Sequence, residues 1–193
     1  YLRKEMTLPV DIGINAEIVL GNRDRLLAAS SPTGPAFEGA QISGGQRAAP
    51  GEIGRVRIDR DTLEPRIRVI GCDLWSDDPG FDEAVVAVGV SGICGSGIIE
   101  VVAEMYLAGI LSSDGVIDGN LSQHSARVIV DGRTFAFVLH KGDITVTVTQ
   151  NDVRAIQLAK AALYAGIRLL MDKLDVEEID RIRLAGAFGS HID

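Results

Sequence analysis

The sequence predicts an α/β fold in which a mixed sheet packs against helices. Two patterns predict it. Short runs of alternating polar and apolar residues, typical of strands, recur along the 193 residues. Two longer stretches carry apolar residues at steps of three and four, as amphipathic helices do. A chain of this length buries about 70% of the surface of its unfolded form, so it can fold without disulfide bonds.

The strands begin with a β-hairpin over residues 8–20, interrupted at Asp-Ile-Gly and closed by a turn cluster at 21–24. A second hairpin centres on Asp131-Gly132-Arg133, because Asp-Gly accepts the positive φ of a tight turn. The sheet is expected to be antiparallel or mixed. Further strands are expected at 26–29, 56–58, 67–70, 127–130, 134–139, 144–148 and 181–185.

Two main helices follow from the apolar spacing. One covers 98–110 and is preceded by the glycine-rich sequence 92–97. The longest begins after Thr149-Gln-Asn-Asp152, which resembles a capping box with Asp in place of Glu, and its apolar stripe extends to Leu170 as core or subunit interface. A short helix at 36–42 and a helical turn at 176–180 are also expected.

Composition excludes several classes of protein. Twenty-seven acidic residues against nineteen basic ones give a net charge of -8 without a basic cluster, which disfavours nucleic acid as a partner. No apolar run approaches the ~20 residues of a membrane span, so a soluble protein is expected. Cys72 and Cys94 are far apart and His124, His140 and His191 are isolated, which argues against a disulfide framework and against a zinc or iron-sulfur site in this chain. A reducing cytoplasm fits best.

The first candidate site is the turn Asp11-Ile12-Gly13-Ile14-Asn15. Gly13 would let the backbone approach a phosphate, Asn15 would donate a hydrogen bond, and Asp11 would hold Mg²⁺, which prefers carboxylate and water oxygens. The alternative for this common sequence is a strand irregularity or bulge.

Two further glycine turns are candidates. In Gly92-Ile93-Cys94-Gly95-Ser96-Gly97 the start of a helix would attract an anion or ribose oxygens, with Ser96 as N-cap or ligand donor. The alternative is a tight loop that lets strand and helix pack closely. Gly186-Ala187-Phe188-Gly189 would pass close to a purine face, or would be an ordinary strand end.

In this order and at these separations the motifs resemble the second half of an actin-like ATPase of the acetate kinase, heat-shock chaperone and actin superfamily. DIGINAEIVLGN, SSPTGPAFEGA, RAAP, GICGSGIIE, TQNDVRAIQLAKAA and LAGAFG together resemble the C-terminal ATPase domain of the reductive activators of corrinoid proteins. The similarity covers nearly the whole chain and is specific, because six spaced motifs carry it. It implies a ribonuclease-H-like lobe that contributes half of a nucleotide cleft.

The resemblance implies roles for the three turns. Asp11 would serve the metal, Gly13, Ile14 and Asn15 the phosphates, Gly92 and Gly95 to Gly97 the sugar or phosphate side, and Gly186, Ala187, Phe188 and Gly189 the base. Glu38 could orient a water as a catalytic group, or be a solvated or capping residue. Where the family usually reads DIGTNGE, this chain has Ile14 and Ala16, which implies a slower ATPase or a switch that binds without turnover.

The resemblance also implies a longer protein. Such activators carry an N-terminal [2Fe-2S] ferredoxin-like domain and use ATP and Mg²⁺ to drive an electron onto the cobalt(II) of a corrinoid protein, which restores cobalt(I). The chain opens at Tyr1 and stops at Asp193 just after a turn, so we expect a fragment rather than a complete protein processed at both ends. The first phosphate hairpin of the family is not found in it, so the fragment should bind nucleotide weakly and hydrolyse essentially none. A homodimer is plausible by the same resemblance.

Two rival interpretations stay open. An actin-like small-molecule kinase lobe would need a dedicated base, for which Glu38 is the candidate. A nucleotide-free interaction module would have a decayed site marked by Ile14 and Ala16. In the acidic loop 72–78, Trp75 is either an exposed anchor for a protein partner or a half-buried plug.

Overall fold

The computed structural model describes residues 4–13 and 15–185. The chain forms two compact units, one made of residues 1–37 and 157–193 and the other of residues 38–156. In the described part of the chain, no helix combines the length and the apolar character needed to cross a membrane.

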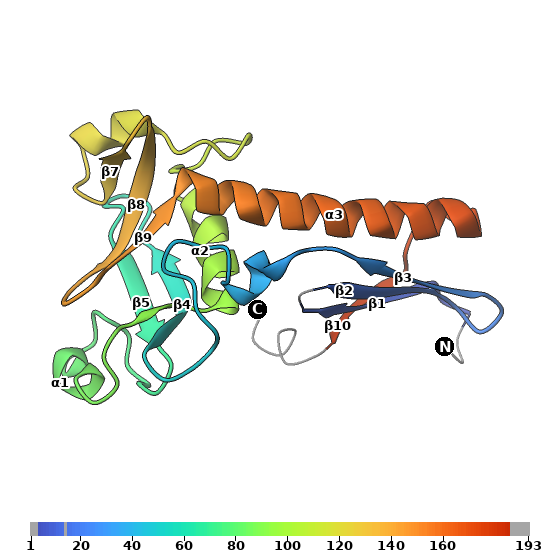
Figure 1. The fold of residues 1–193 in the computed structure, drawn as a ribbon, viewed down its shortest axis with the longest axis horizontal. Helices are drawn as coiled ribbons and strands as arrows, with labels where there is room; N and C mark the ends of the chain where they lie inside the picture. The colour runs from blue at the N-terminus through green and yellow to red at the C-terminus, as the bar shows by residue number, and fades with distance from the viewer. Residues whose placement is uncertain (1–3, 14, 186–193) are drawn as a thin grey trace. The chain divides into compact units, whose positions relative to one another are not determined.

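The first unit holds a mixed sheet in the order β10-β1-β2-β3 (Figure 1). Strands β1 (Thr7–Ile12), β2 (Ala16–Gly21) and β3 (Leu26–Ser31) are antiparallel neighbours, whereas β10 (Arg181–Ala185) runs parallel to β1. The hairpin expected over 8–20 and the strand at 181–185 are therefore confirmed, and the sheet is mixed.

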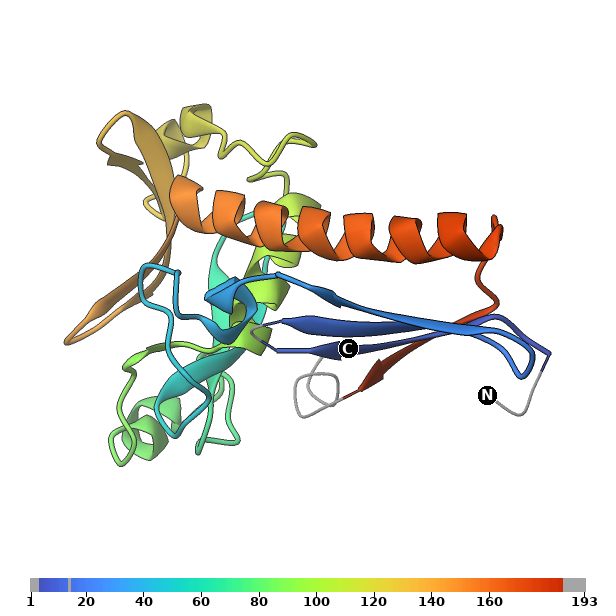
Figure 2. The same ribbon diagram turned by 45° about the vertical axis from the view of Figure 1, so that its right-hand side comes forward.

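The core of the first unit lies between this sheet and the C-terminal turns of α3 (Gln150–Leu174), which runs along the sheet in Figures 1 and 2. Alternate residues of β1 and β2 face the helix, and each buried aliphatic side chain contributes about 1.5–3 kcal/mol. The buried set is Met6, Leu8, Val10, Ala16, Ile18, Leu20, Leu170, Met171 and Leu174. The stripe that the sequence assigned to core or interface is thus core at its C-terminal end.

Helix α3 begins and ends at recognisable motifs. Asp152 Oδ2 accepts a hydrogen bond from Thr149 N at 2.7 Å, and Thr149 Oγ1 accepts one from Asp152 N at 3.2 Å, so Asp replaces Glu in a working capping box. After Leu174, Asp175 adopts φ 54° and Val176 N donates to Met171 O at 3.1 Å, as in a Schellman motif. The helical turn expected at 176–180 is absent, because this motif ends the helix and leads directly to β10.

The second unit is built on two three-stranded sheets, ordered β5-β4-β6 and β7-β8-β9. The strand pair joined by residues 59–65 and the hairpin turn at Gly132, whose φ is 60°, lie where the sequence predicts them, and the strand expected at 144–148 pairs with β8. Its strands are β4 (Glu52–Ile58), β5 (Pro65–Val69), β6 (Gly92–Ile93), β7 (Val128–Asp131), β8 (Thr134–Lys141) and β9 (Thr145–Thr149). Its helical elements are α1 (Phe81–Val85), α2 (Gly95–Leu107) and η2 (Gly119–Gln123).

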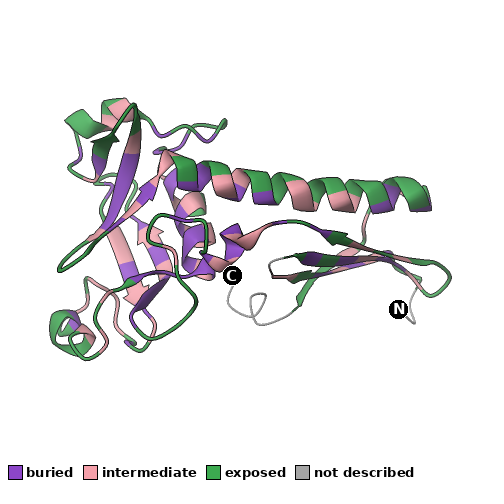
Figure 3. Ribbon diagram, viewed as in Figure 1, coloured by how far each residue is buried: buried purple, intermediate pink, exposed green. Residues whose placement is uncertain are grey.

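Burial follows the pattern expected for packed layers (Figure 3). Residues 136–139 of β8 are buried, whereas Ile129 and Val130 on β7 are exposed. Cys72 and Cys94 are both buried free thiols. Trp75 is half-buried and the Arg66 guanidinium lies 5.2 Å from its ring centre, so the expectation of a half-buried loop plug is met.

One expected helix differs in extent. Instead of a helix over 36–42, a single 3-10 turn, η1 (Pro35–Glu38), follows Pro35. Gly39 has φ 84°, a left-handed conformation that ends the turn, and Ile42 N then donates to Gly39 O at 3.2 Å.

Candidate functional site

The first candidate turn joins β1 to β2 in the first unit. Asp11 is exposed near the end of β1, Gly13 is partly buried and Asn15 is exposed. Gly13 N donates to Asn15 O at 3.2 Å, while Gly13 O accepts a hydrogen bond from the hydroxyl of the buried Thr33 at 3.2 Å. Thr33 therefore anchors the Gly13 carbonyl, while the side chains of Asp11 and Asn15 stay at the surface. Ile14 lies outside the described residues.

A polar row crosses the sheet beside this turn. Asp11 lies opposite Glu17 on β2, and Glu17 lies opposite Ser30 on β3, whose hydroxyl donates to Glu17 Oε1 at 2.8 Å. The two carboxylates are thus on one face of the sheet, where like charges repel unless a cation lies between them. Glu17 is not among the residues predicted from the sequence, although its place six residues after Asp11 in a tight hairpin puts it on the same face.

The third candidate turn, residues 186–189, lies outside the described residues. The strand that leads into it is described, and its last residue, Ala185, pairs in register with Asp11. The chain therefore enters residues 186–189 from a position adjacent to Asp11.

The second candidate turn lies in the second unit and differs from its prediction. Gly92 belongs to strand β6, and α2 already begins at Gly95, so Ser96 and Gly97 lie in the first helical turn rather than in a loop. Cys94, not Ser96, is the N-cap residue, and its side chain makes no capping hydrogen bond. The expectation of Ser96 as N-cap is therefore wrong.

Two glycines of this segment have a packing reason. A Cβ atom at Gly97 would collide with Ile53 O and lie 2.9 Å from Ile93 Cγ1. A Cβ atom at Gly92 would lie 2.8 Å from Glu52 Oε2, and Glu52 is buried with its other oxygen accepting the Ser91 hydroxyl at 2.6 Å. Close packing of strand and helix, the alternative that the sequence left open, accounts for Gly97, whereas Gly92 packs against the Gly44 carbonyl and the neighbouring strand β4.

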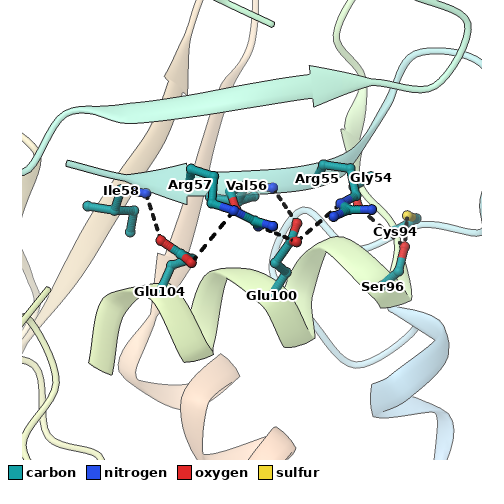
Figure 4. Close-up of polar contacts among 9 residues, drawn as sticks. All are labelled: Gly54, Arg55, Val56, Arg57, Ile58, Cys94, Ser96, Glu100 and Glu104. Carbon is teal, nitrogen blue, oxygen red and sulfur yellow. Dashed lines mark hydrogen bonds and ion pairs between the residues drawn. The ribbon is translucent and has the colours of Figure 1, made fainter. Parts of the chain in front are cut away.

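Side chains one turn apart on α2 bond to every second residue of β4 (Figure 4). Four helical residues rise about 6.0 Å and two strand residues about 6.6 Å, so the two repeats match closely. Ser96 Oγ donates to Gly54 O at 3.4 Å, Glu100 Oε2 accepts from Val56 N at 2.6 Å, and Glu104 Oε2 accepts from Ile58 N at 3.0 Å. The helix side chains thus take the place of a neighbouring strand.

Two arginines complete this contact. Arg55 Nε donates to Glu100 Oε1 at 3.1 Å, and Arg57 forms a hydrogen-bonded ion pair with the same oxygen, as Figure 4 shows. The side chain of Glu100 is only 17% exposed, so these charge-assisted bonds are partly shielded from water. Acidic residues four apart on a helix and basic residues two apart on a strand are the sequence signal for this network, and none of the predicted sites includes it.

Asp11 and Glu17 form a carboxylate pair that bears on metal binding. In the part of the chain that the structure describes, no group of three or more His, Cys, Asp and Glu side chains could hold a metal ion. The exposed carboxylates of Asp11 and Glu17 do fit Mg²⁺, because this ion accepts one or two protein carboxylates and completes its shell with water and phosphate oxygens. Glu38, the other candidate catalytic residue, is partly buried at the end of η1.

Comparison with known proteins points to one family. The sequence profile described as "C-terminal domain of RACo the ASKHA domain" matches residues 5–193. The chain is 31% identical over 98% of its length to "Corrinoid activation enzyme RamQ" of Eubacterium limosum, and 29% identical over 100% of its length to "[Co(II) methylated amine-specific corrinoid protein] reductase" of Methanosarcina barkeri. It spans 31% and 34% of those two proteins, about a third of their length.

The fold comparison agrees. A solved structure titled "Reductive activator for corrinoid,iron-sulfur protein" superposes with a TM-score of 0.79 and 34% identity, covering 97% of this chain and 28% of that one. The actin-like α/β fold, with its mixed sheet and packed helices, is therefore confirmed. The chain belongs to the family of C-terminal actin-like (ASKHA) domains of the corrinoid-protein activators.

Proposed function

We propose that the chain is the second lobe of the ATPase domain of an ATP-dependent reductive activator. The whole protein would return the cobalt(II) corrinoid of a methyl-transfer protein to cobalt(I) by passing it one electron from a reduced [2Fe-2S] cluster. Support comes from the relatives, whose names describe corrinoid activation and reduction and which are about three times as long. The additional length of those relatives is enough for a ferredoxin-like domain and a first phosphate hairpin.

The observation that carries the nucleotide part is the β1–β2 turn. Its Asp11 carboxylate and Asn15 amide are exposed, its Gly13 carbonyl is held by the Thr33 hydroxyl, and the strand leading to residues 186–189 ends beside it. Asp11, with Glu17, would hold Mg²⁺, and Gly13, Ile14 and Asn15 would meet the phosphates. Residues 186–189 would meet the base. ATP hydrolysis supplies the free energy that an uphill electron transfer requires.

The second turn has a different part in this proposal. The hydroxyl of Ser96 is used within the protein, so residues 95–97 would serve the sugar or phosphate side through backbone N–H groups at the start of α2. Glu38 would orient the attacking water. A corrinoid protein as partner, a homodimer and a cytoplasmic location, the last in keeping with two free thiols, complete the proposal.

Calorimetric titration of the chain with ADP tests the nucleotide part, with and without Mg²⁺. We expect weak binding that Mg²⁺ strengthens, and Asp11→Asn should remove most of that gain, about tenfold in affinity or 1.4 kcal/mol. Asp24→Asn, a charge-matched change at the opposite end of the same sheet, should leave affinity unchanged. Absence of any binding heat would favour the nucleotide-free interaction module instead.

A further inference from the structure

A cavity of about 500 Å³ lies in the second unit, remote from its glycine turn. Its walls come from the connection 59–65, the start of β5 and the end of β8, and its apolar floor from Ile67 and Leu139, each 2% exposed. Glu52 at the start of β4 pairs with Gly92, whereas Ile58 at its end pairs with Pro65 of the cavity wall. Six residues of strand separate the two places by about 20 Å.

The donors around the cavity are only partly used. Arg127 directs Nε and Nη2 at Glu64 Oε2, at 2.9 and 2.7 Å, which leaves its Nη1 without a partner in the described chain. Among the described residues, the side chains of His140 and Lys141 have no hydrogen-bond or ion-pair partner either. Arg66 lies beside them, with Nε 2.6 Å from Asp77 Oδ2.

Each of the three carboxylates that line the cavity has one oxygen engaged. Hydrogen bonds from the Thr62 backbone N–H and hydroxyl, together with the Asp61 N–H, hold the pKa of Asp59 below its ordinary value. Glu64 and Asp77 each have one oxygen on an arginine. Burial first, and then the nearby charge of Arg127, lower the pKa of His140. The Arg127 charge therefore acts on the His140 imidazole, in a cavity that three carboxylates also line.

We propose that this cavity binds a small molecule carrying a phosphate or carboxylate group, with the anion held by Arg127, His140 and Lys141 and an apolar part lying on Ile67 and Leu139. The volume is within the ~300–1,000 Å³ of small-molecule sites, which also combine an apolar lining with a few convergent polar groups. The guanidinium and ammonium groups supply the charge-assisted donors that oxyanions accept best. No residue of the proposed nucleotide site lines this cavity, so each proposal can be tested independently of the other.

The imidazole protons of the three histidines provide a direct test by NMR on the whole chain. Each signal is titrated with pH in the presence of inorganic pyrophosphate, glutarate, or sodium chloride at the same ionic strength, and His140→Gln assigns the His140 signal. A bound oxyanion favours the imidazolium, so the pKa of His140 should rise by at least about half a unit while that of His124 stays constant. A response to pyrophosphate or to glutarate also decides between phosphate and carboxylate.

Variants separate a built site from general charge effects. Lys141→Ala, at an exposed position, should weaken the dissociation constant of the effective probe at least about fivefold and leave the fold intact. Lys160→Ala removes the same charge from an exposed position on α3 and should change nothing. The proposal is overturned if neither probe moves His140 beyond the chloride reference, or if both lysine variants weaken binding equally.

Discussion

The two described glycine turns look alike in sequence and differ in what surrounds them. At the β1–β2 turn, Asp11 and Asn15 are exposed and a like-charged neighbour, Glu17, lies across the strand pair. At the start of α2, Gly92 and Gly97 are buried against backbone and side-chain atoms. The first arrangement is costly for stability and open to a ligand, whereas the second stabilises the fold.

The comparison teaches that a glycine motif indicates a close contact with the backbone but does not say whether a ligand or another part of the chain makes that contact. At Gly97 the approaching group is the chain's own Ile53 carbonyl, and at Gly92 it is the Gly44 carbonyl, followed by the carboxylate of Glu52. At the β1–β2 turn the polar side chains are exposed, so a dissolved ligand can approach the glycine instead. The two turns should therefore respond to mutation in opposite ways.

The largest effect is expected from Gly97→Ala. Its Cβ would collide with Ile53 O, which is backbone and cannot move aside, so we expect a loss of about 3 kcal/mol in the free energy of unfolding. Urea denaturation measures it. The control is Gly109→Ala, where nothing lies within 4 Å and the φ of +74° alone should cost about 1 kcal/mol. Equal losses in the two variants would contradict a packing role for Gly97.

Glu100→Ala should have the next largest effect. The change leaves Val56 N without its acceptor and Arg55 and Arg57 without their shared carboxylate, and we expect it to cost about 2 kcal/mol. Glu177→Ala, at an exposed position, should cost less than about 0.5 kcal/mol. A double-mutant cycle of Glu100→Ala with Arg57→Ala would give a coupling energy near zero if the pair seen in Figure 4 contributed nothing.

The sequence predicts the elements whose signals are local. Asp-Gly at residues 131–132 gives the β7–β8 hairpin, and Thr149 with Asp152 gives the start of α3, because turn and capping chemistry depend on neighbours in the chain. The start of α2 is missed because glycine disfavours helix, and tertiary packing under Ile53 overrides that preference at Gly97. The end of α3 is missed because Asp175 takes the left-handed position that glycine usually fills.

The site follows the same division. Asp11, Gly13 and Asn15 lie close together in the sequence, so they could be predicted as site residues from it. Glu17 lies next to Asp11 through strand pairing, and Thr33 binds the carbonyl of Gly13, twenty positions away in the sequence. Neither contact can be predicted without the register of the strands. The hydrogen-bond network between α2 and β4 depends on the match between the four-residue repeat of the helix and the two-residue repeat of the strand. These two elements are far apart in the sequence, so no local stretch of it shows the match.

Ser96→Ala should have a smaller effect on stability than Glu100→Ala. It also tests whether the side chain at the start of α2 contacts the nucleotide. The hydroxyl makes a long hydrogen bond to Gly54 O at 3.4 Å and lies 3.2 Å from Cys94 Sγ, a weak hydrogen-bonding atom, so its loss should cost about 0.5–1 kcal/mol. Because the hydroxyl is occupied, ADP affinity should change less than about threefold, which is under 0.7 kcal/mol. A tenfold loss of affinity with unchanged stability would show instead that the side chain itself contacts the nucleotide.

Glu17→Gln gives the smallest effect, with the opposite sign. The amide keeps an acceptor for the Ser30 hydroxyl but removes the repulsion with Asp11, so stability should rise by about 0.5 kcal/mol at low salt. Both carboxylates are exposed, so about 1 M sodium chloride, whose screening length is about 3 Å, should abolish the gain. The same variant should weaken the Mg²⁺-dependent binding of ADP. A variant that is less stable at every salt concentration would mean that Glu17 supports the sheet, and the β1–β2 turn would then resemble the start of α2 after all.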